Sequence, residues 1–373
     1  MPLSSEDVLR LNVLLAGEVD AIRIDESRMV VHGLSEGQEA KIQLNPNCRD
    51  EQYLKQVREL LSGHVLGSPG GYPVYLKRWT RMGQARDDSL SDLLKLGEPE
   101  AVMAVVCAPG LTNELARLAW WVAPEAEHAR RMLERENIVQ GSMGPELASY
   151  LVEFLPFEED PLAIVRSVSL VLQPGLIDDD VRMRIWERGR AKNVFRIGFL
   201  KATPHDLPEQ LPARPEHESC AAKLATLADT NPYARLLKLV LSDKGQSFLD
   251  SCEKILRKPA NQEVVSALLD TIGNYFRPEG REPEMVQDIN MILERTENTC
   301  ANDEGAVSEL LRQFPELQAE VKAMLTLSQV TEAVVIPVFA KSDAIGTVMR
   351  RQLEPITSAL FQQFSVLQGR QGA

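Results

Sequence analysis

The chain of 373 residues is long enough for two or three domains at about 150 residues each. Hydrophobic residues make up 44% of it and charged residues 25%, which is typical of a soluble globular protein and excludes wholesale disorder. The net charge of -13 disfavours a dedicated nucleic-acid binder and a protein held on an anionic membrane by charge. The best apolar runs, residues 101–111 and 333–340, fall short of the roughly 18 residues that suggest a membrane span. The N-terminus lacks the basic region of a secretory signal, so we predict a cytoplasmic protein without a membrane partner.

The first 84 residues predict a small α+β domain. A helix is expected over residues 4–16, because a serine can cap its start and its apolar residues repeat at helical spacing. Three short alternating stretches separated by turn residues then predict an antiparallel meander. These stretches are residues 20–25, 28–32 and 39–44. A second amphipathic helix over residues 50–61 is expected to end at Gly63.

Strand signals nearly stop at about residue 87, and helical segments separated by Gly and Pro follow. VCAPGL at residues 106–111 resembles VLQPGL at residues 171–176. In each copy an apolar helix is expected to stop at Pro-Gly, and a new helix to start from a capping residue a few positions later. Two copies are fewer than the roughly three that make a repeat array stable, so a helical repeat and a chance likeness both stay open.

The later half of the chain is predicted to be helical. Residues 202–216 contain four prolines, which forbid a helix and extend the chain, so we place a linker there. Apolar stripes at helical spacing follow, one starting after a capping Asn261 and one over residues 343–367 that Pro355 interrupts. The predicted fold class is therefore mainly α, with helical hairpins or a bundle and a small α+β N-terminal domain. The predicted parts are residues 1–84, a helical-hairpin domain over 85–201, the linker over 202–216 and an all-helical domain over 217–373.

Standard catalytic and cofactor motifs are missing from the sequence. It has no dinucleotide-binding glycine motif after a strand, no Walker-type loop and no nucleophile elbow. The five histidines are widely spaced and the five cysteines include no C-x-x-C pair, so neither a metal site nor a redox dithiol is encoded locally. Acidic runs at residues 158–160 and 178–180 are interpreted as helix caps rather than cation sites. We predict no cofactor, no metal and no catalytic residue, and we favour a non-catalytic function over an enzyme.

The most suggestive binding segment is residues 63–86, where a glycine-rich loop leads into basic and aromatic residues. Glycines let backbone N–H groups approach an anion, arginines bind oxyanions through two N–H groups, and aromatic rings offer stacking faces. The alternative is a connecting loop and an amphipathic strand whose arginines are solvated or paired with acids. The candidates for anion or partner binding are Gly70, Gly71, Lys77, Arg78, Trp79 and Arg81.

The cysteines and a tryptophan pair offer weaker signals. Cys48 lies in a polar stretch just before a helix start, which would stabilise a thiolate, and it is the candidate for an exposed thiol. Its alternative is an incidental loop cysteine. Cys107 lies in the apolar run AVMAVVCAP and is predicted to be buried and inert. Trp120 and Trp121 point about 100° apart on a helix, so either both pack in the core or one is more exposed.

Three stretches of the chain resemble the DsrS family. They are LRLNVLLAGEVDAIRIDESRMVVHGL (residues 9–34), RELLSGHVLGSPGGYPVYLKRWTRMGQ (58–84) and LGEPEAVMAVVCAPGLTNELARLAWW (96–121). The family comprises sulfur-reduction accessory proteins of sulfur-oxidising bacteria, whose genes lie with those of the reverse-acting dissimilatory sulfite reductase. The likeness extends from about residue 9 to residue 207. It consists of whole segments rather than a catalytic motif, so it carries over no functional residue.

The resemblance implies a cytoplasmic accessory or regulatory protein that serves the oxidation of stored sulfur. The expected partners are proteins, with the sulfite reductase system as the candidate, and nucleic acid is not expected. Two alternatives come from the residues themselves. One is a persulfide-handling protein or enzyme that uses Cys48. The other is an anion or nucleotide sensor that uses residues 63–86.

Overall fold

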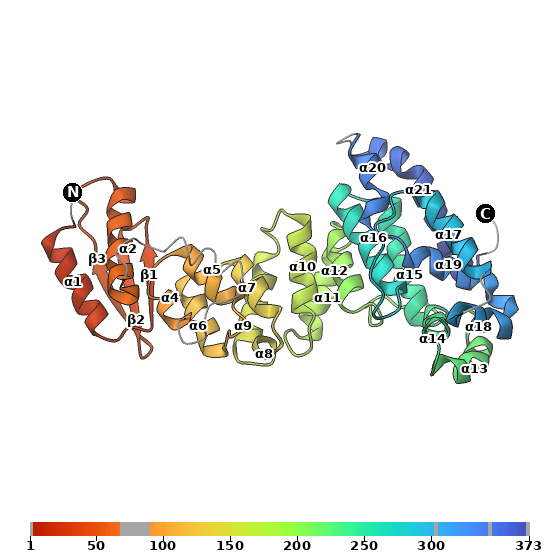
Figure 1. Cartoon of the computed structure of the whole chain (residues 1–373), viewed down its shortest axis with the longest axis horizontal. Helices are drawn as coiled ribbons and strands as arrows, with labels where there is room; N and C mark the ends of the chain where they lie inside the picture. Colours follow the sequence, from red (N-terminus) through yellow and green to blue (C-terminus); the bar gives the residue numbers. More distant parts are fainter. Residues whose placement is uncertain (1–2, 68–89, 302–304, 342–344, 371–373) are drawn as a thin grey trace. The chain divides into compact units, whose positions relative to one another are not determined.

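The computed structural model describes residues 3–67, 90–301, 305–341 and 345–370. It confirms the predicted fold class, since helices dominate and a small three-stranded antiparallel sheet lies near the N-terminus (Figure 1). The chain forms two compact units. The N-terminal unit holds residues 1–156 and 173–177, and the C-terminal unit holds residues 157–172 and 178–373.

The N-terminal unit begins with a helix, a meander and a second helix. These are α1 (Ser5–Ala16), β1 (Ala21–Asp25), β2 (Val30–Ser35), β3 (Gln38–Gln43) and α2 (Asp50–Leu66). The central strand β2 pairs antiparallel with β1 and with β3, so that Val31 lies opposite Ile24 and Ile42. The apolar side chains of α1, α2 and one sheet face form a single buried core. The predicted meander and first helix are confirmed.

Helix α2 does not end at Gly63 as predicted. It continues to Leu66 and ends at Gly67, which adopts the left-handed conformation with φ of 64°. A glycine inside a helix costs about 1 kcal/mol relative to alanine. The packing of buried Leu61 and Ser62 around that position offsets the cost, so the helix runs through it.

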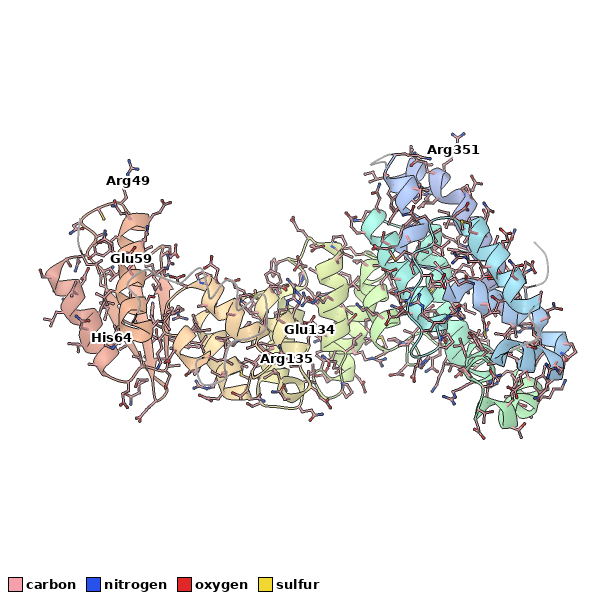
Figure 2. All side chains as sticks on the ribbon, in the orientation of Figure 1. Arg49, Glu59, His64, Glu134, Arg135 and Arg351 are labelled. Carbon is pink, nitrogen blue, oxygen red and sulfur yellow. The ribbon has the colours of Figure 1, made fainter. Side chains whose placement is uncertain are left out.

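The rest of the N-terminal unit is a set of short helices that follows the sheet. They are α4 (Leu90–Leu93), α5 (Pro99–Cys107), α6 (Asn113–Val122), α7 (Ala126–Leu133), α8 (Glu136–Val139) and α9 (Met143–Phe154). The amide of Ile22 in β1 donates to the Leu94 carbonyl at 2.9 Å and so joins the sheet to this helical part. Arg135, labelled in Figure 2, donates to the Cys107 carbonyl at 2.7 Å and satisfies the C-terminal end of α5. Trp120 is buried edge-on against Tyr150, with 4.7 Å between ring centroids, and Trp121 is half-buried.

The C-terminal unit contains helices and no strand over the residues that the structure describes. The helix pairs with the most extensive packing in this unit are α10 with α12, α13 with α14, and α19 with α21. Gly198 lets α12 approach α10, because a Cβ there would lie 2.5 Å from Val168 Cβ. The elements are α10 (Pro161–Val171), α11 (Asp179–Arg188), α12 (Val194–Ala202), α13 (His217–Ala228), α14 (Pro232–Val240), α15 (Asp243–Arg257), α16 (Gln262–Phe276), α17 (Ile289–Ala301), α18 (Ala306–Gln313), η2 (Pro315–Leu317), α19 (Gln318–Ser328), η3 (Glu332–Val334), α20 (Ile336–Phe339) and α21 (Gly346–Leu367).

The predicted caps are confirmed at three helix starts. The side chains of Asp160, Asp178 and Asn261 each accept a backbone N–H of the helix that follows. Both Pro-Gly segments join two helices as predicted, α5 to α6 and α10 to α11. Whether they are copies of one unit stays a prediction.

The proline-rich segment predicted as a linker is irregular in the structure. Residues 203–216 contain no helix or strand, in agreement with the density of prolines there, and they lie within the C-terminal unit. The predicted domain boundaries stay a prediction.

Pro355 does not interrupt its helix, because α21 runs unbroken from Gly346 to Leu367. Its buried residues on both sides of the proline, Leu353 and Ile356, keep the helix packed although Pro355 removes one backbone hydrogen bond.

Candidate partner-binding groove

Most of the predicted binding residues lie outside the described part of the chain. The sites concerned are Gly70, Gly71, Lys77, Arg78, Trp79 and Arg81. The anion-binding role assigned to them stays a prediction. The described part of the chain offers thiols and surface grooves as further candidate sites.

The structure reverses the expected exposure of the thiols. Cys107 is exposed and not buried as predicted, because it shares the outer face of α5 with Met103, four residues earlier, while Val105 and Val106 point inward. Cys48 is half-buried against the core beneath α1 and α2, and its Sγ lies 3.7 Å from the Arg49 carbonyl oxygen. Figure 2 shows the neighbouring Arg49 side chain extending away from the ribbon. Cys48 is therefore not the most accessible thiol of the described residues.

Thiol reactivity should follow this order. With iodoacetamide under native conditions, we expect Cys107 to be alkylated first, because it is the cysteine classed as exposed among the described residues. Cys252 should stay unmodified until the protein unfolds, since complete burial raises the pKa of its thiol well above the ordinary range, with a contribution from nearby Asp250. Peptide mass spectrometry at successive times measures the order. Alkylation of Cys252 as early as Cys107 would contradict the structure.

Helix α1 has apolar residues on two opposite faces. Leu11 and Leu15 are buried and face the core. Leu14 packs tightly on Gly33 of β2, because a Cβ at position 33 would lie 2.6 Å from Leu14 Cδ1. Leu9 lies two residues before Leu11 and so points about 200° away around the helix. It is 65% exposed, and Val13, one turn later, is 66% exposed. The core therefore uses only one of the two apolar faces of α1.

The second face borders a groove that runs from α1 to the sheet. The groove has a volume of about 530 Å³. Its walls are mainly apolar, and among the described residues that line it only Arg10 and Lys41 carry a charged side chain. In a chain with a net charge of -13, a groove whose own lining carries only basic charges is distinctive, although each of the two pairs with an acid beside the groove. The lining residues are Leu9, Arg10, Val13, Leu14, Gly17, Val19, Gly33, Ser35, Ala40, Lys41 and Ile42.

A buried polar network holds α1 in place. The Asp7 carboxylate, fully buried, accepts a hydrogen bond from the Tyr53 hydroxyl of α2 and one of 2.8 Å from the Asn45 amide. Burial opposes ionisation of Asp7, but these hydrogen bonds outweigh it and lower its pKa. Ser4 caps the same helix by accepting the Asp7 amide at 3.2 Å. The wall of the groove is therefore fixed to the second helix and to the end of the sheet.

The sequence of α1 contains a signal for this groove. Val8, Leu11, Leu14 and Leu15 form the stripe at helical spacing in this segment, and Leu9 and Val13 fall outside it. Two large apolar residues one turn apart, outside the inward stripe of a short helix, are a hint of an interaction surface. Only the structure shows that the sheet continues this surface.

A second hollow in the N-terminal unit is lined by charges of both signs. Arg23 stacks over the Trp121 ring at 4.9 Å and pairs with Glu39 at 3.3 Å, and His32 of β2 also bonds Glu39. The hydrogen bond from His32, partly opposed by desolvation, lowers the pKa of Glu39. Arg23, His32 and Glu39 therefore already serve as partners for one another.

The described residues contain neither a metal-binding cluster nor a membrane-spanning helix. No three His, Cys, Asp or Glu side chains within residues 3–67, 90–301, 305–341 and 345–370 lie together as a metal ion would require. In the same ranges, no single helix is both long enough and apolar enough to cross a membrane.

Comparison with known proteins gives no match: no protein-family model, curated protein or solved structure matches the chain.

Proposed function

We propose that this chain is a non-catalytic accessory or regulatory protein that binds a protein partner in the groove between α1 and the sheet. The observation that carries the proposal is the exposure of Leu9 and Val13 beside an apolar groove of about 530 Å³. Burying a side chain of this size contributes about 1.5–3 kcal/mol, so the two residues together can anchor a partner. Central apolar anchors surrounded by polar groups are the usual arrangement of a binding hot spot.

The occupant we propose is an apolar segment of another protein that carries an acidic side chain near its anchor residues. Arg10 and Lys41 supply the basic groups that would meet this acid, at the rim of the apolar lining. Both lie within reach of an acid of their own, since Arg10 pairs with Glu6 and Lys41 lies 3.9 Å from Glu39. These exposed pairs contribute little to stability, so exchanging them for a partner's acid costs little.

The cellular setting we propose rests on the resemblance to the DsrS family. It places the chain in the cytoplasmic oxidation of stored sulfur and makes the reverse-acting sulfite reductase, or a protein of its sulfur relay, the proposed partner. The anchors Leu9 and Val13 lie within the first of the three stretches that carry the resemblance.

The direct test is a binding assay between the purified chain and the purified sulfite reductase by biolayer interferometry. The double variant Leu9→Glu, Val13→Glu is expected to weaken binding by about a hundredfold or more, because two buried apolar anchors become charges. Both positions are exposed in the free chain, so the variant should fold and melt as the wild type does. Val348→Glu is the matched control, since Val348 is also an exposed valine on a helix, at 56%, but lies outside the groove.

Affinity purification from sulfur-grown cells extends the test to the other relay proteins. The wild type and Val348→Glu should retain the same sulfur-relay protein, and the double variant should lose it. Equal recovery by all three chains would overturn the groove as the binding surface. Recovery of no protein of the sulfur system by the wild type would overturn the cellular setting.

A further inference from the structure

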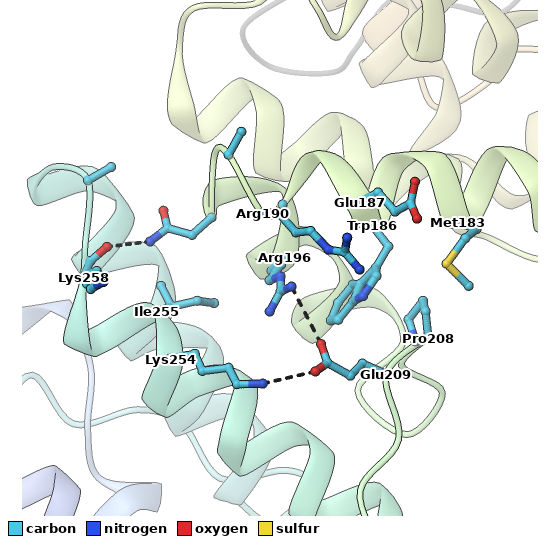
Figure 3. A pocket seen from close by; sticks show the side chains of 14 residues that line it. Met183, Trp186, Glu187, Arg190, Arg196, Pro208, Glu209, Lys254, Ile255 and Lys258 are labelled. Atoms are coloured by element: carbon cyan, nitrogen blue, oxygen red, sulfur yellow. Dashed lines mark hydrogen bonds and ion pairs between the residues drawn. The ribbon is translucent and has the colours of Figure 1, made fainter.

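A cavity in the C-terminal unit has features that the proposed partner contact does not use. It has a volume of about 750 Å³ and is bounded by α11, α12, α15 and residues 208–209 (Figure 3). Its side chains come from parts of the chain that are far apart in sequence. The lining residues are Met183, Trp186, Glu187, Gly189, Arg190, Ala191, Asn193, Arg196, Pro208, Glu209, Lys254, Ile255, Lys258 and Ala260.

The cavity carries more basic than acidic groups. Four lining residues are cationic and two, Glu187 and Glu209, are anionic, which leaves a formal excess of two positive charges in an acidic protein. Lys254 is neutralised by Asp250 at 2.8 Å and by Glu209 at 3.2 Å. Within the described ranges, Arg190 and Lys258 have no acidic partner. Their charges remain available to an anion.

Arg196 is held in the wall of this cavity with its hydrogen-bonding capacity incompletely used. Its guanidinium stacks over the Trp186 ring at 4.7 Å, and its side chain is only 12% exposed. Figure 3 shows it pointing toward Glu209, but the closest approach, from Nη2 to Oε2, is 3.7 Å and too long for a hydrogen bond. Gly189 leaves space for this side-chain conformation, because a Cβ at position 189 would lie 2.5 Å from Arg196 Cγ.

Two buried polar atoms in this wall lack a partner. Within the described ranges only six buried side-chain polar atoms have no hydrogen-bond partner, and two of them, Arg196 Nε and Asn193 Oδ1, belong to this one cavity. The orientation of the Asn193 amide is set by the structure, since its Nδ2 donates to the Lys258 carbonyl at 2.8 Å and an oxygen there would be repelled. A buried donor or acceptor without a partner costs free energy, so such a pair needs an explanation.

We propose that this cavity binds a small molecule bearing an oxyanion, either a phosphoryl or a sulfur oxyanion group. The Arg196 guanidinium, whose hydrogen bonds within the protein are incomplete, donates to an oxyanion oxygen of the ligand. Arg190 and Lys258 add positive charge around it. Arginine is suited to this role because its planar guanidinium matches oxyanion geometry and stays charged. This proposal does not depend on the partner contact at α1.

The test measures anion binding to the full chain by calorimetry and by tryptophan fluorescence at constant ionic strength. The probes are inorganic phosphate and ADP in one arm, and sulfite and thiosulfate in the other, with chloride as the reference salt. At least one probe should bind saturably, and the arm in which it does identifies the source of the oxyanion. The fluorescence change should disappear in Trp186→Phe while the heat of binding persists, because Trp186 lies in the cavity wall under Arg196.

Two variants of lining residues should change anion binding in opposite directions, and a third variant outside the cavity is the control. Arg196→Gln should weaken binding about tenfold or more, the loss expected for a hydrogen bond to a charged group. Glu209→Gln should tighten binding, since it removes the acid that competes for Arg196 and Lys254. Arg257→Gln should change nothing. Arg257 is the matched control, because it also stacks on an aromatic ring, that of Phe361 at 4.8 Å, but lies outside the cavity.

The proposal fails if no probe binds saturably to the wild type, or if every probe acts as chloride does. It also fails if Arg196→Gln binds as well as Arg257→Gln does. Melting curves without ligand show whether Arg196→Gln folds. If it does not, Lys258→Glu decides the matter, because this lysine is exposed and its charge reversal should still weaken anion binding.

Discussion

Replacing Gly273 with alanine is expected to lower the free energy of unfolding by about 3 kcal/mol, although alanine is the better helix former. Gly273 lies inside α16 and is fully packed against the turn after α19. A Cβ at this position would lie 1.9 Å from the Val330 carbonyl oxygen, and that oxygen belongs to the backbone, so no side-chain rotation relieves the clash. The helix and the turn would have to separate, and the buried residues between them would lose contact.

Denaturant unfolding followed by circular dichroism measures this effect. Asn274→Ala is the matched control, because Asn274 is the next residue of the same helix but is exposed, and its loss should change the free energy of unfolding by no more than about 0.5 kcal/mol. A second effect is expected nearby, since the Glu332 amide donates to Asp270 on α16 at 2.8 Å and would be displaced with the turn. A stabilised Gly273→Ala protein would show that α16 and the Val330 turn do not pack as described.

Replacing Asp7 with asparagine should cost about 3 kcal/mol at neutral pH, through the buried network that ties α1 to α2. The Asp7 carboxylate accepts hydrogen bonds from Tyr53 and from the Asn45 amide, and hydrogen bonds to a charged group contribute about 1.5–3 kcal/mol each. Asparagine offers one acceptor oxygen and a donor, so part of the network is broken. Tyr53→Phe should produce a smaller loss, because it removes one donor and leaves the others. Glu6→Gln is the control, since the exposed Glu6 precedes Asp7 in the same helix.

The Asp7 contribution should depend on pH in a definite direction. Its pKa is lowered in the folded chain relative to the value of about 3.9 of an unfolded aspartate. The ionised group therefore stabilises the fold at pH above the unfolded value, and this contribution is lost as the pH falls through the lower folded pKa. The difference in free energy of unfolding between wild type and Asp7→Asn should be largest near neutral pH and should shrink below about pH 4. A difference that grows toward acid pH would contradict the hydrogen bonds assigned to Asp7.

Local features were predictable where the physics acts over a few residues. A capping side chain reaches a backbone N–H only two or three positions away, so Asp160, Asp178 and Asn261 could be assigned from sequence. The meander needed only the alternation of apolar residues and the turn residues between the strands. Fold class follows from the same short-range patterns, summed along the chain.

Helix ends and exposure were less predictable, because neighbours in space can override a local preference. Gly63 and Pro355 are ordinary helix breakers, yet α2 and α21 continue through them because buried side chains on either side stay packed. Cys107 lies in an apolar run but is exposed, since helical geometry turns the last residue of α5 outward. The predicted anion-binding segment at residues 63–86 lies mostly outside the described residues, so it stays a prediction.

The sequence by itself determined the mainly helical class, the small N-terminal sheet and the helix starts, because these depend on side chains close together in the chain. The tertiary structure alone decided the two candidate sites. It placed the exposed Leu9 and Val13 beside the sheet. It also brought Arg196 and Asn193 of the α12 region against Lys254 and Lys258, which follow after more than fifty residues. Charge, burial and unmet hydrogen bonds in such sites arise only when distant segments pack together, and no local pattern records that packing.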